Sequence, residues 1–283
     1  MKKTLAAALL AAAALSLPLA FAGPAAAKDW KTVRIATEGA YMPWNGADAS
    51  GKLIGFEIDL AAELCKKAGV TCEIKAQDWD GIIPGLQQGK YDAIMAGMSI
   101  TDERRKLIEF SKPYAADPAI FATLNGSPLL AQKTGARIDL SDAASPSKAA
   151  FEALEKALKG KSVGVQVSTI HQTMMEKHLP GVSLRTYDKT DSMALDLASG
   201  RIDAMLSDRS VIADLQKAAD GKNIALFGPG FVGGVLGEGM GVGLRKTDPD
   251  LKALFDKAIA AANADGTTSK LAEKWFGYDV AAK

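Results

Sequence analysis

The stretch LQQGKYDAIMAGMSITDER, from Leu86 to Arg104, decides the fold. It reads as the end of a helix, a turn made by a glycine and a lysine, a short buried strand over Tyr91–Met95, and a polar loop. A second copy of the pattern, LASGRIDAMLSDRS, runs from Leu197 to Ser210. Two helix–turn–strand units of one design predict two lobes of similar build.

Around these two units, strands and helices alternate along the chain. The expected strands are Val33–Thr37, Thr71–Ala76, Tyr91–Met95, Lys161–Val165, Ser183–Tyr187, Ile202–Leu206, Ile224–Phe227 and Gly241–Leu244. The expected helices are Gly55–Ala68, Gly81–Gln88 with Asp80 as its cap, Ser147–Lys159, Ser168–Lys177, Asp191–Ser199 and Pro249–Ala264. This alternation predicts an α/β fold with mostly parallel sheets.

Residues 1–27 have the pattern of a secretory signal peptide. A start with Lys2 and Lys3 is followed by the apolar run Leu5–Phe21 and by small residues at Ala25–Ala27. A membrane anchor is the alternative, but a serine and a proline interrupt the run, and the small residues favour cleavage. We therefore expect an exported, soluble protein that begins near Lys28.

The charge balance argues against nucleic acid or an anionic membrane surface as the main partner. The 283 residues include 34 basic and 33 acidic side chains, for a formal net charge of +1. A surface that binds nucleic acid is usually strongly basic. The length suffices for one large domain or two modest ones.

The chain has only two cysteines, Cys65 and Cys72, and in an exported protein such a pair is a disulfide candidate. A redox or metal-binding pair is disfavoured, because the spacing is not C-x-x-C and the two histidines are far away. Motifs for nucleophilic catalysis, phosphate binding and zinc binding are absent. We expect no metal, no cofactor and no enzymatic activity.

Two segments are expected to cross between the lobes. Pro113 and Pro118 mark an extended segment, and the glycine-rich run 228–243 is either a flexible loop or, as we favour, the return crossing. Lobe 1 would then comprise residues 28–116 and 232–283, and lobe 2 residues 117–231. The hinge would lie near 115–119 and 228–240, since hinges absorb dihedral change at few positions.

The ends of the predicted strands carry side chains suited to binding a zwitterion. Because ligands of open α/β sheets bind beyond the carboxyl ends of the strands, Arg104 and Asp208 should face each other across a cleft. Arg104 suits a carboxylate, and Asp208 suits an ammonium group together with Ser99. Neighbouring Arg105 reads as a solvated helix charge.

Further candidates surround this pair. Tyr41 and Trp79 follow successive strands, where their rings could hold an aliphatic or cationic stem. The Thr169 amide would lie in the first turn of a helix, which favours an anion. Two acids near the cleft edge, Glu38 and Glu57, would favour a ligand with a positive charge at the far end of its side chain. For Glu57 the alternative is a charge at the start of a helix, which needs no ligand. His171 is a possible site residue at the start of its helix.

These motifs resemble the periplasmic binding proteins for lysine, arginine, ornithine and histidine, and the related octopine- and nopaline-binding proteins. The resemblance covers nearly the whole chain after residue 27. It is carried by TEGAYMPW (37–44), GKLIGFEIDLAAELCKKAGVTC (51–72), DWDGIIPGL (78–86), YDAIMAGMSITDERRKLIEFSKPYA (91–115), GVGLRKTDPDLKALFDKAI (241–259) and DGTTSKLAEKWFG (265–277).

The resemblance implies a periplasmic solute-binding protein that is not an enzyme, with the type II two-lobed fold, a Cys65–Cys72 disulfide, a monomeric state and delivery of its ligand to an ABC permease. In that family the arginine matching Arg104 holds the ligand α-carboxylate, with backbone amides at positions matching Ser99 and Thr169. The amine is held by the residues that match Asp208, Ser99 and the Gly97 carbonyl. The ligand side chain lies between aromatics matching Tyr41 and Trp79, near the acid matching Glu38.

The sequence departs from the basic amino-acid binders at several of these positions. Ala96 and Gly97 replace two common serines, which enlarges the pocket. Trp79 and Glu38 are larger than usual and are more similar to the opine binders. Ser168, also expected at the site, stands where a glycine is usual before Thr169. The segment 129–158 is longer than typical and inherits no role.

An enzyme on the same scaffold is the competing hypothesis. Periplasmic cyclohexadienyl dehydratases, which act on prephenate or arogenate, have a similar fold and need a general acid in the cleft. Glu57 is the acid that such a role could recruit. The acidic residues expected in the pocket nevertheless favour a cationic ligand. A weaker third possibility is that a sensor or chemoreceptor recognises the ligand-loaded protein.

Overall fold

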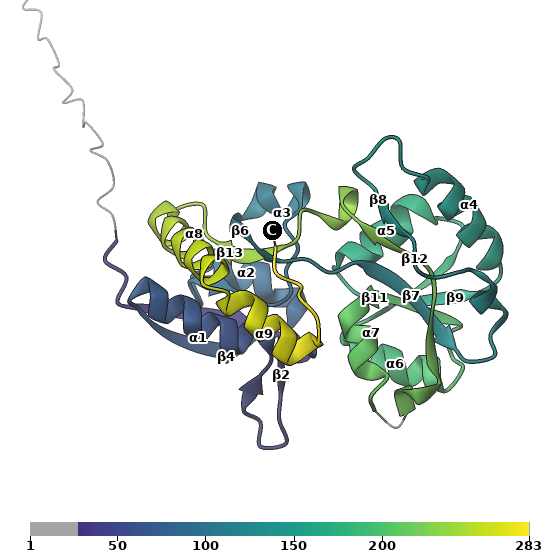
Figure 1. The fold of residues 1–283 in the computed structure, drawn as a ribbon, viewed down its shortest axis with the longest axis horizontal. Coiled ribbons are helices and arrows are strands. Elements are labelled where there is room, and N and C mark those ends of the chain that lie inside the picture. The colour runs from purple at the N-terminus through teal and green to yellow at the C-terminus, as the bar shows by residue number, and fades with distance from the viewer. Residues whose placement is uncertain (1–27, 219, 283) are drawn as a thin grey trace, which may run out of the picture.

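The computed structural model describes residues 28–218 and 220–282. The expected signal peptide, residues 1–27, lies outside the described residues. Two α/β lobes lie side by side and are joined by two crossings of the chain, as Figure 1 shows. The two-lobed α/β prediction is therefore confirmed. No helix within the described ranges combines the length and the apolar content needed to cross a lipid bilayer.

The first lobe is built on a five-stranded sheet in the order β4-β1-β5-β13-β6. Strand β1 runs parallel to β4 and β5, whereas β13 is antiparallel to β5 and β6. The strands are β1 (Thr32–Thr37), β4 (Thr71–Ala76), β5 (Ala93–Ile94), β6 (Glu109–Ala115) and β13 (Met240–Leu244). A small hairpin, β2 (Gly46–Ala47) with β3 (Leu53–Ile54), projects from this lobe.

Helices cover both faces of that sheet. They are α1 (Phe56–Ala68), α2 (Ile82–Gln87), α3 (Asp102–Leu107), α8 (Pro249–Ala264) and α9 (Thr267–Phe276), with the 3₁₀ turn η1 (Trp79–Gly81) before α2. Apolar residues spaced by four, Leu60 and Leu64, are fully buried on the inner face of α1. Gly69, in the left-handed region at φ 70°, ends the helix. The predicted disulfide between Cys65 and Cys72 joins α1 to β4.

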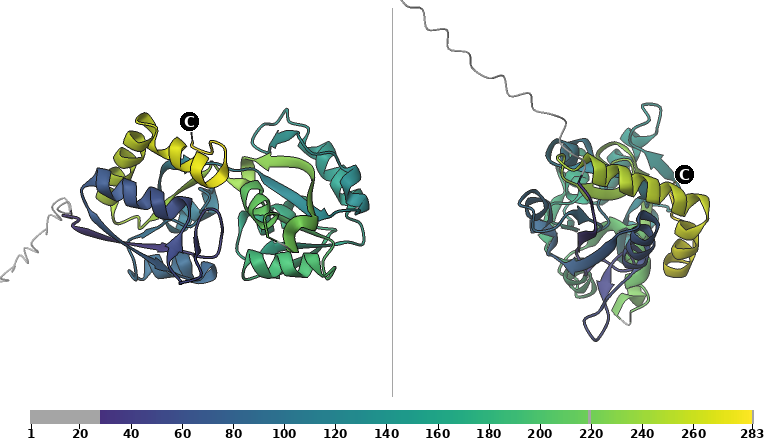
Figure 2. Two further views of the ribbon diagram at one scale, coloured as in Figure 1. Left: turned by 60° about the horizontal axis from the view of Figure 1, so that its bottom comes forward. Right: turned by 90° about the vertical axis from the view of Figure 1, so that its left-hand side faces the viewer.

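The second lobe has a six-stranded sheet in the order β10-β9-β11-β7-β12-β8. Its strands are β7 (Ala119–Leu124), β8 (Arg137–Asp139), β9 (Ser162–Gln166), β10 (Ser183–Tyr187), β11 (Ala204–Asp208) and β12 (Ile224–Val232). Its helices are α4 (Ser147–Ala157), α5 (Ile170–His178), α6 (Thr190–Ala198) and α7 (Arg209–Leu215), with 3₁₀ turns η2 (Pro128–Ala131), η3 (Asp220–Asn223) and η4 (Gly234–Leu236). The left view of Figure 2 shows the two lobes next to each other from another direction.

The two copies of the sequence pattern occupy matching places. One leads from α2 into β5 and the other from α6 into β11, and both strands pair in parallel with the second strand of their sheet, β1 and β9. Gly89 and Gly200 each turn the chain with a positive φ, of 74° and 70°. An L side chain is disfavoured in this region, which explains the glycine in both copies.

Two local expectations are wrong. The strand expected over Tyr91–Met95 is only Ala93–Ile94, although the Asp92 and Met95 amides on either side still donate to β1, at the Arg34 and Ala36 carbonyls. Asp80 does not cap α2; it lies inside η1, and Gly81 precedes the helix without a side-chain cap. The Asp80 carboxylate instead accepts a hydrogen bond from Ser168 Oγ at 2.9 Å, across the gap between the lobes.

Candidate functional site

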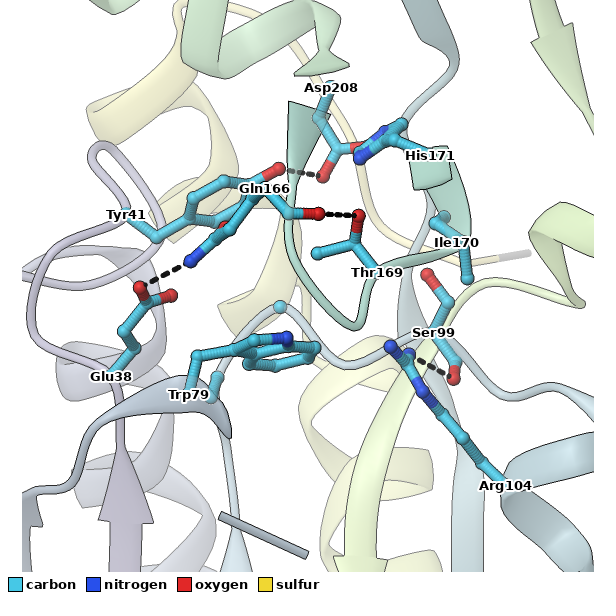
Figure 3. A pocket seen from close by; sticks show the side chains of 12 residues that line it. Glu38, Tyr41, Trp79, Ser99, Arg104, Gln166, Thr169, Ile170, His171 and Asp208 are labelled. Atoms are coloured by element: carbon cyan, nitrogen blue, oxygen red, sulfur yellow. Dashed lines mark hydrogen bonds and ion pairs between the residues drawn. The ribbon is translucent and has the colours of Figure 1, made fainter. Parts of the chain in front are cut away.

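A cavity between the lobes gathers side chains from the carboxyl ends of β1, β4, β5, β9 and β11, as expected for parallel strands. It contains about 310 Å³ of space outside the atoms. Figure 3 shows it from close by. Its lining includes most of the predicted site residues and two that sequence reasoning missed: Glu38, Tyr41, Trp79, Ala96, Gly97, Ser99, Arg104, Gln166, Thr169, Ile170, His171 and Asp208.

Arg104 enters the cavity from α3 in the first lobe. Its guanidinium donates to the Ser99 carbonyl at 2.9 Å and lies 5.1 Å from the centre of the Trp79 ring. Burial lowers the pKa of Arg104 to about 10, while the charge of Asp208 acts in the opposite direction. The side chain therefore stays cationic at neutral pH and presents a positive charge to the cavity.

Asp208 supplies the opposite charge from the second lobe. It is the last residue of β11, it immediately precedes α7, and it is 3% exposed. Its Oδ2 accepts a hydrogen bond of 2.8 Å from the hydroxyl of Tyr41, which belongs to the first lobe. Burial and the nearby carboxylate raise the pKa of Tyr41, which keeps the hydroxyl a donor.

Glu38 forms the second contact across the cavity. The amide Nε2 of Gln166 donates to Glu38 Oε1 at 2.6 Å and to the Asp188 carbonyl at 3.0 Å. Burial raises the pKa of Glu38 to about 7, although the hydrogen bond from Gln166 opposes this shift. Each acid of the site thus meets a donor from the opposite lobe.

Gln166 is a residue that sequence reasoning missed. It is the final residue of β9 and is 4% exposed. A polar side chain at the carboxyl end of a predicted parallel strand was the available signal. The other missed residue, Ile170, is apolar and carried no such signal.

Glu57 does not line the cavity, which corrects its place among the possible site residues. It is fully buried in the first lobe, where Oε2 accepts from Asn45 Nδ2 at 2.7 Å and Oε1 accepts from the Gly97 amide at 2.7 Å. The Tyr114 hydroxyl donates to the same carboxylate. Burial raises the pKa of Glu57, and its three hydrogen bonds oppose that shift. Glu57 therefore holds the loop that contains Gly97 from inside the first lobe.

The loop after β5 forms the floor of the cavity. Gly97 has a φ of 60°, and a Cβ added there would lie 3.3 Å from the Tyr41 ring. A side chain at this position would therefore be strained and would crowd the ring. Ala96 and Ser99, both buried, flank this glycine.

The amino end of α5 faces the cavity from the second lobe. Thr169 is its N-cap: its Oγ1 accepts from the Gln172 amide at 3.4 Å and donates to the Gln166 carbonyl at 2.7 Å. Ile170 and His171, in the first turn, also line the cavity. The partial positive charge of a helix amino terminus favours an anion here.

Ser168, by contrast, lies outside the cavity lining. Its backbone has a φ of 59°, and its carbonyl accepts from Trp79 Nε1 at 3.3 Å and from Arg104 at 3.5 Å. The side chain points to Asp80 instead. Its backbone thus tethers the aromatic and cationic wall of the first lobe to the second lobe.

The arrangement suits a small molecule with separated charges. Arg104 and the start of α5 favour an anionic group, whereas Asp208 and Glu38 favour cationic ones. Two aromatic rings, Tyr41 and Trp79, lie between these groups and can contact an apolar stem.

The chain belongs to the bacterial extracellular solute-binding proteins, family 3, whose pattern matches residues 33–278. It is 40% identical over 279 residues to the octopine-binding periplasmic protein of Rhizobium meliloti, covering 92% of this chain and 94% of the relative. It is 39% identical over 258 residues to the lysine/arginine/ornithine-binding periplasmic protein of Escherichia coli (strain K12), covering 88% and 89%.

Solved structures agree with this assignment. An ancestral arginine-binding protein bound to glutamine is 34% identical, with a TM-score of 0.73 and coverage of 88% of this chain and 100% of that one. An ancestral amino acid-binding protein described as a precursor of cyclohexadienyl dehydratase is 32% identical, with a TM-score of 0.71 and coverage of 87% and 95%. The relative on the path to the enzyme is thus itself named as an amino acid-binding protein.

Proposed function

We propose that this protein captures a cationic amino acid, such as arginine, lysine, ornithine or histidine, or an arginine-derived opine, and delivers it to an ABC permease. One observation carries the proposal: Arg104 and Asp208, of opposite charge and from opposite lobes, line one cavity together with a second acid, Glu38. The names of the octopine- and lysine/arginine/ornithine-binding relatives support the ligand class.

The anionic end of the ligand binds at Arg104. The guanidinium takes the α-carboxylate, and the backbone amides of Ser99 and Thr169 add hydrogen bonds. The contacts of Arg104 with Ser99 and of Thr169 with α5 support this role, because both hold the donors against the cavity. Charge-assisted hydrogen bonds of this kind contribute roughly 1.5–3 kcal/mol each.

The cationic groups of the ligand bind at the two acids. The α-amine meets Asp208, Ser99 and the Gly97 carbonyl, and it would compete with the Tyr41 hydroxyl for Asp208 Oδ2. The ligand side chain passes between Tyr41 and Trp79, and its positive end replaces the Gln166 amide at Glu38.

Ligand capture requires the lobes to move, and the backbone hydrogen bonds suggest where. Before Asp117, the Ala116 amide is held by the Val280 carbonyl of lobe 1; after it, the Pro118 carbonyl is held by the Arg209 amide of lobe 2. Asp117 therefore is one pivot, within the expected hinge segment 115–119.

The second crossing has a similar transition at Gly237. The turn η4 packs on α5 of lobe 2, whereas the Glu238 amide is bonded to the Ile100 carbonyl of lobe 1 at 3.0 Å. A second pivot at Gly237 moves the expected boundary at 231/232 along the chain, so that lobe 1 comprises residues 28–116 and 238–283 and lobe 2, which includes η4, residues 117–236. Small-angle scattering should give a smaller radius of gyration with saturating arginine than without; an unchanged radius contradicts the hinge.

The surrounding biology follows from the relatives, which are named as periplasmic proteins. We propose that this chain is exported to the periplasm, acts as a monomer and docks on a permease in the inner membrane. Cell fractionation and size-exclusion chromatography test the location and the monomeric state. Recovery of the protein in the cytoplasm or as a stable dimer would contradict these statements.

Calorimetry tests the ligand class. Arginine, lysine, ornithine, histidine, octopine and nopaline are titrated in turn, and at least one should bind with a stoichiometry of one per chain. No heat with any of them overturns the proposal. The dehydratase alternative is not favoured, because Glu57, the acid proposed for it, lies outside the cavity. Turnover of prephenate or arogenate would revive it.

A further inference from the structure

His171 is a buried imidazole of the cavity that the proposed contacts leave unused. It lies in the first turn of α5, and its side chain is 5% exposed. Its Nε2 lies 3.3 Å from Asp208 Oδ1, but the geometry is not that of a hydrogen bond, and neither atom has a hydrogen-bond partner within residues 28–218 and 220–282. Figure 3 shows the ring beside the Asp208 carboxylate.

An unpartnered polar atom in a buried wall destabilises the protein unless a ligand or an ordered water satisfies it. The two oxygens of Asp208 have different neighbours: Oδ2 accepts a hydrogen bond from the Tyr41 hydroxyl, whereas Oδ1 faces His171. A ligand amine bound at Asp208 would therefore lie directly beside the imidazole. Any group carried on that nitrogen would come within reach of Nε2.

A plain cationic amino acid leaves this position without a matching charge. Its carboxylate, amine and side chain correspond to Arg104, Asp208 and Glu38, which are the other charged side chains of the cavity lining. An imidazole beside Asp208 then has Asp208 Oδ1 as its neighbouring anion, at 3.3 Å, and must share it with the ligand ammonium group. An acidic substituent on the amine would supply a second anion, and the nearby amino end of α5 favours it as well.

We propose that His171 selects ligands whose α-nitrogen carries a carboxyalkyl group, by donating from Nε2 to that second carboxylate. This inference rests on the proposed function, which it narrows to the opine type of ligand. In octopine a single carbon separates the second carboxylate from the amine, so an amine on Asp208 places the carboxylate next to His171. Ala96 and Gly97, which line the same cavity, are small residues.

The test compares octopine with arginine, which differ only in that carboxyalkyl group. Calorimetry should give a lower Kd for octopine in the unchanged protein. In His171→Gln the ratio of the arginine Kd to the octopine Kd should fall by about 10- to 100-fold, the loss expected for one charge-assisted hydrogen bond. Thermal unfolding shows whether the variant is folded.

His178→Gln is the matched control, since His178 lies at the other end of α5 and stacks on Phe151, outside the cavity. It should keep the wild-type ratio. An equal loss for both ligands in His171→Gln, or no change in the ratio, overturns the inference. If the unchanged protein binds arginine but not octopine, the inference fails and the proposed function stands; if it binds no ligand of the series, the proposed function itself fails.

Discussion

The two walls of the cavity are built differently. The wall of lobe 1 is supported from within its own lobe: Glu57 holds Gly97, and the Ser99 carbonyl holds Arg104. The acid of lobe 2, Asp208, instead receives its hydrogen bond from Tyr41 of the opposite lobe. In the same way Gln166 of lobe 2 donates to Glu38 of lobe 1.

This difference suggests that the two walls take part in ligand binding at different stages. Lobe 1 holds Gly97 and Arg104 in place before the lobes meet, so that its cationic group can receive the ligand first. The two acids, Glu38 and Asp208, instead receive their side-chain hydrogen bonds from the opposite lobe. These hydrogen bonds involve the acids that the ligand would use, so a bound ligand would compete with them.

The largest effect is expected at the charge that lobe 1 provides. Arg104→Ala should weaken binding of arginine by roughly 100-fold or more, because the ligand carboxylate would lose its charged partner in a buried site. Arg105→Ala is the control: Arg105 pairs with Glu238 on the surface, and its loss should change the Kd by less than about threefold. Calorimetry on both variants checks this, and similar losses would contradict the distinction.

The internal support of lobe 1 can be tested through stability. Glu57→Ala leaves the Asn45 amide, the Gly97 amide and the Tyr114 hydroxyl without their acceptor, and should lower the free energy of unfolding by on the order of 3 kcal/mol. Urea denaturation measures it.

Asp59 provides the comparison for Glu57, because it lies on the same first turn of α1 but bonds Lys274 and Trp275 near the surface. Asp59→Ala should cost about 1 kcal/mol. Equal losses in the two variants would show that Glu57 has no special role under the cavity.

The acid of lobe 2 should have a smaller effect than Arg104. Asp208→Asn keeps an oxygen for the Tyr41 hydroxyl but removes the charge that meets the ligand amine, so the Kd should rise by about 10- to 30-fold. Asp214→Asn changes an acid that pairs with Lys217 away from the cavity and should leave the Kd unchanged. A similar loss of affinity in both variants would mean that the overall charge of the lobe, and not a contact with Asp208, determines the Kd.

The smallest effect is expected for the pH dependence of ligand affinity, which depends on the protonation of Glu38. Burial raises the pKa of Glu38 from 4.5 to about 7, so below that pH the carboxyl must release a proton before it can pair with a cationic side chain. Affinity for arginine should therefore rise with pH, by up to about tenfold per unit below the pKa, and level off above it.

Glutamine and Glu38→Gln are the controls for this pH dependence. Glutamine has no side-chain charge, and the variant has no proton to release at that position, so either change should flatten the curve. Titrations across this pH range measure it. An identical slope for arginine and glutamine would assign the proton to another group.

Much of the fold could be predicted from local patterns. The boundaries expected for Thr71–Ala76, Ser183–Tyr187 and Pro249–Ala264 are those observed, because apolar periodicity and nearby glycine or proline residues determine such elements. Elements that depend on distant contacts were less predictable: β12 continues to Val232 because it pairs with β7 and with β8.

The candidate site shows the same limit. The ends of predicted strands pointed to Arg104 and Asp208, yet the pattern could not tell that Glu57 turns inward or that the Ser168 side chain turns toward Asp80. Gln166 was overlooked because its partner, Glu38, is distant in the sequence and meets it only across the gap between the lobes.

The sequence by itself determined the two α/β lobes, the disulfide and the residue types that can bind a zwitterion, since these depend on periodicity, spacing and composition. Only the tertiary structure decided which acids face the cavity and which partner each of them meets. The reason is that burial and hydrogen bonding between lobes depend on side-chain direction and on contacts more than a hundred positions apart, which no local pattern encodes.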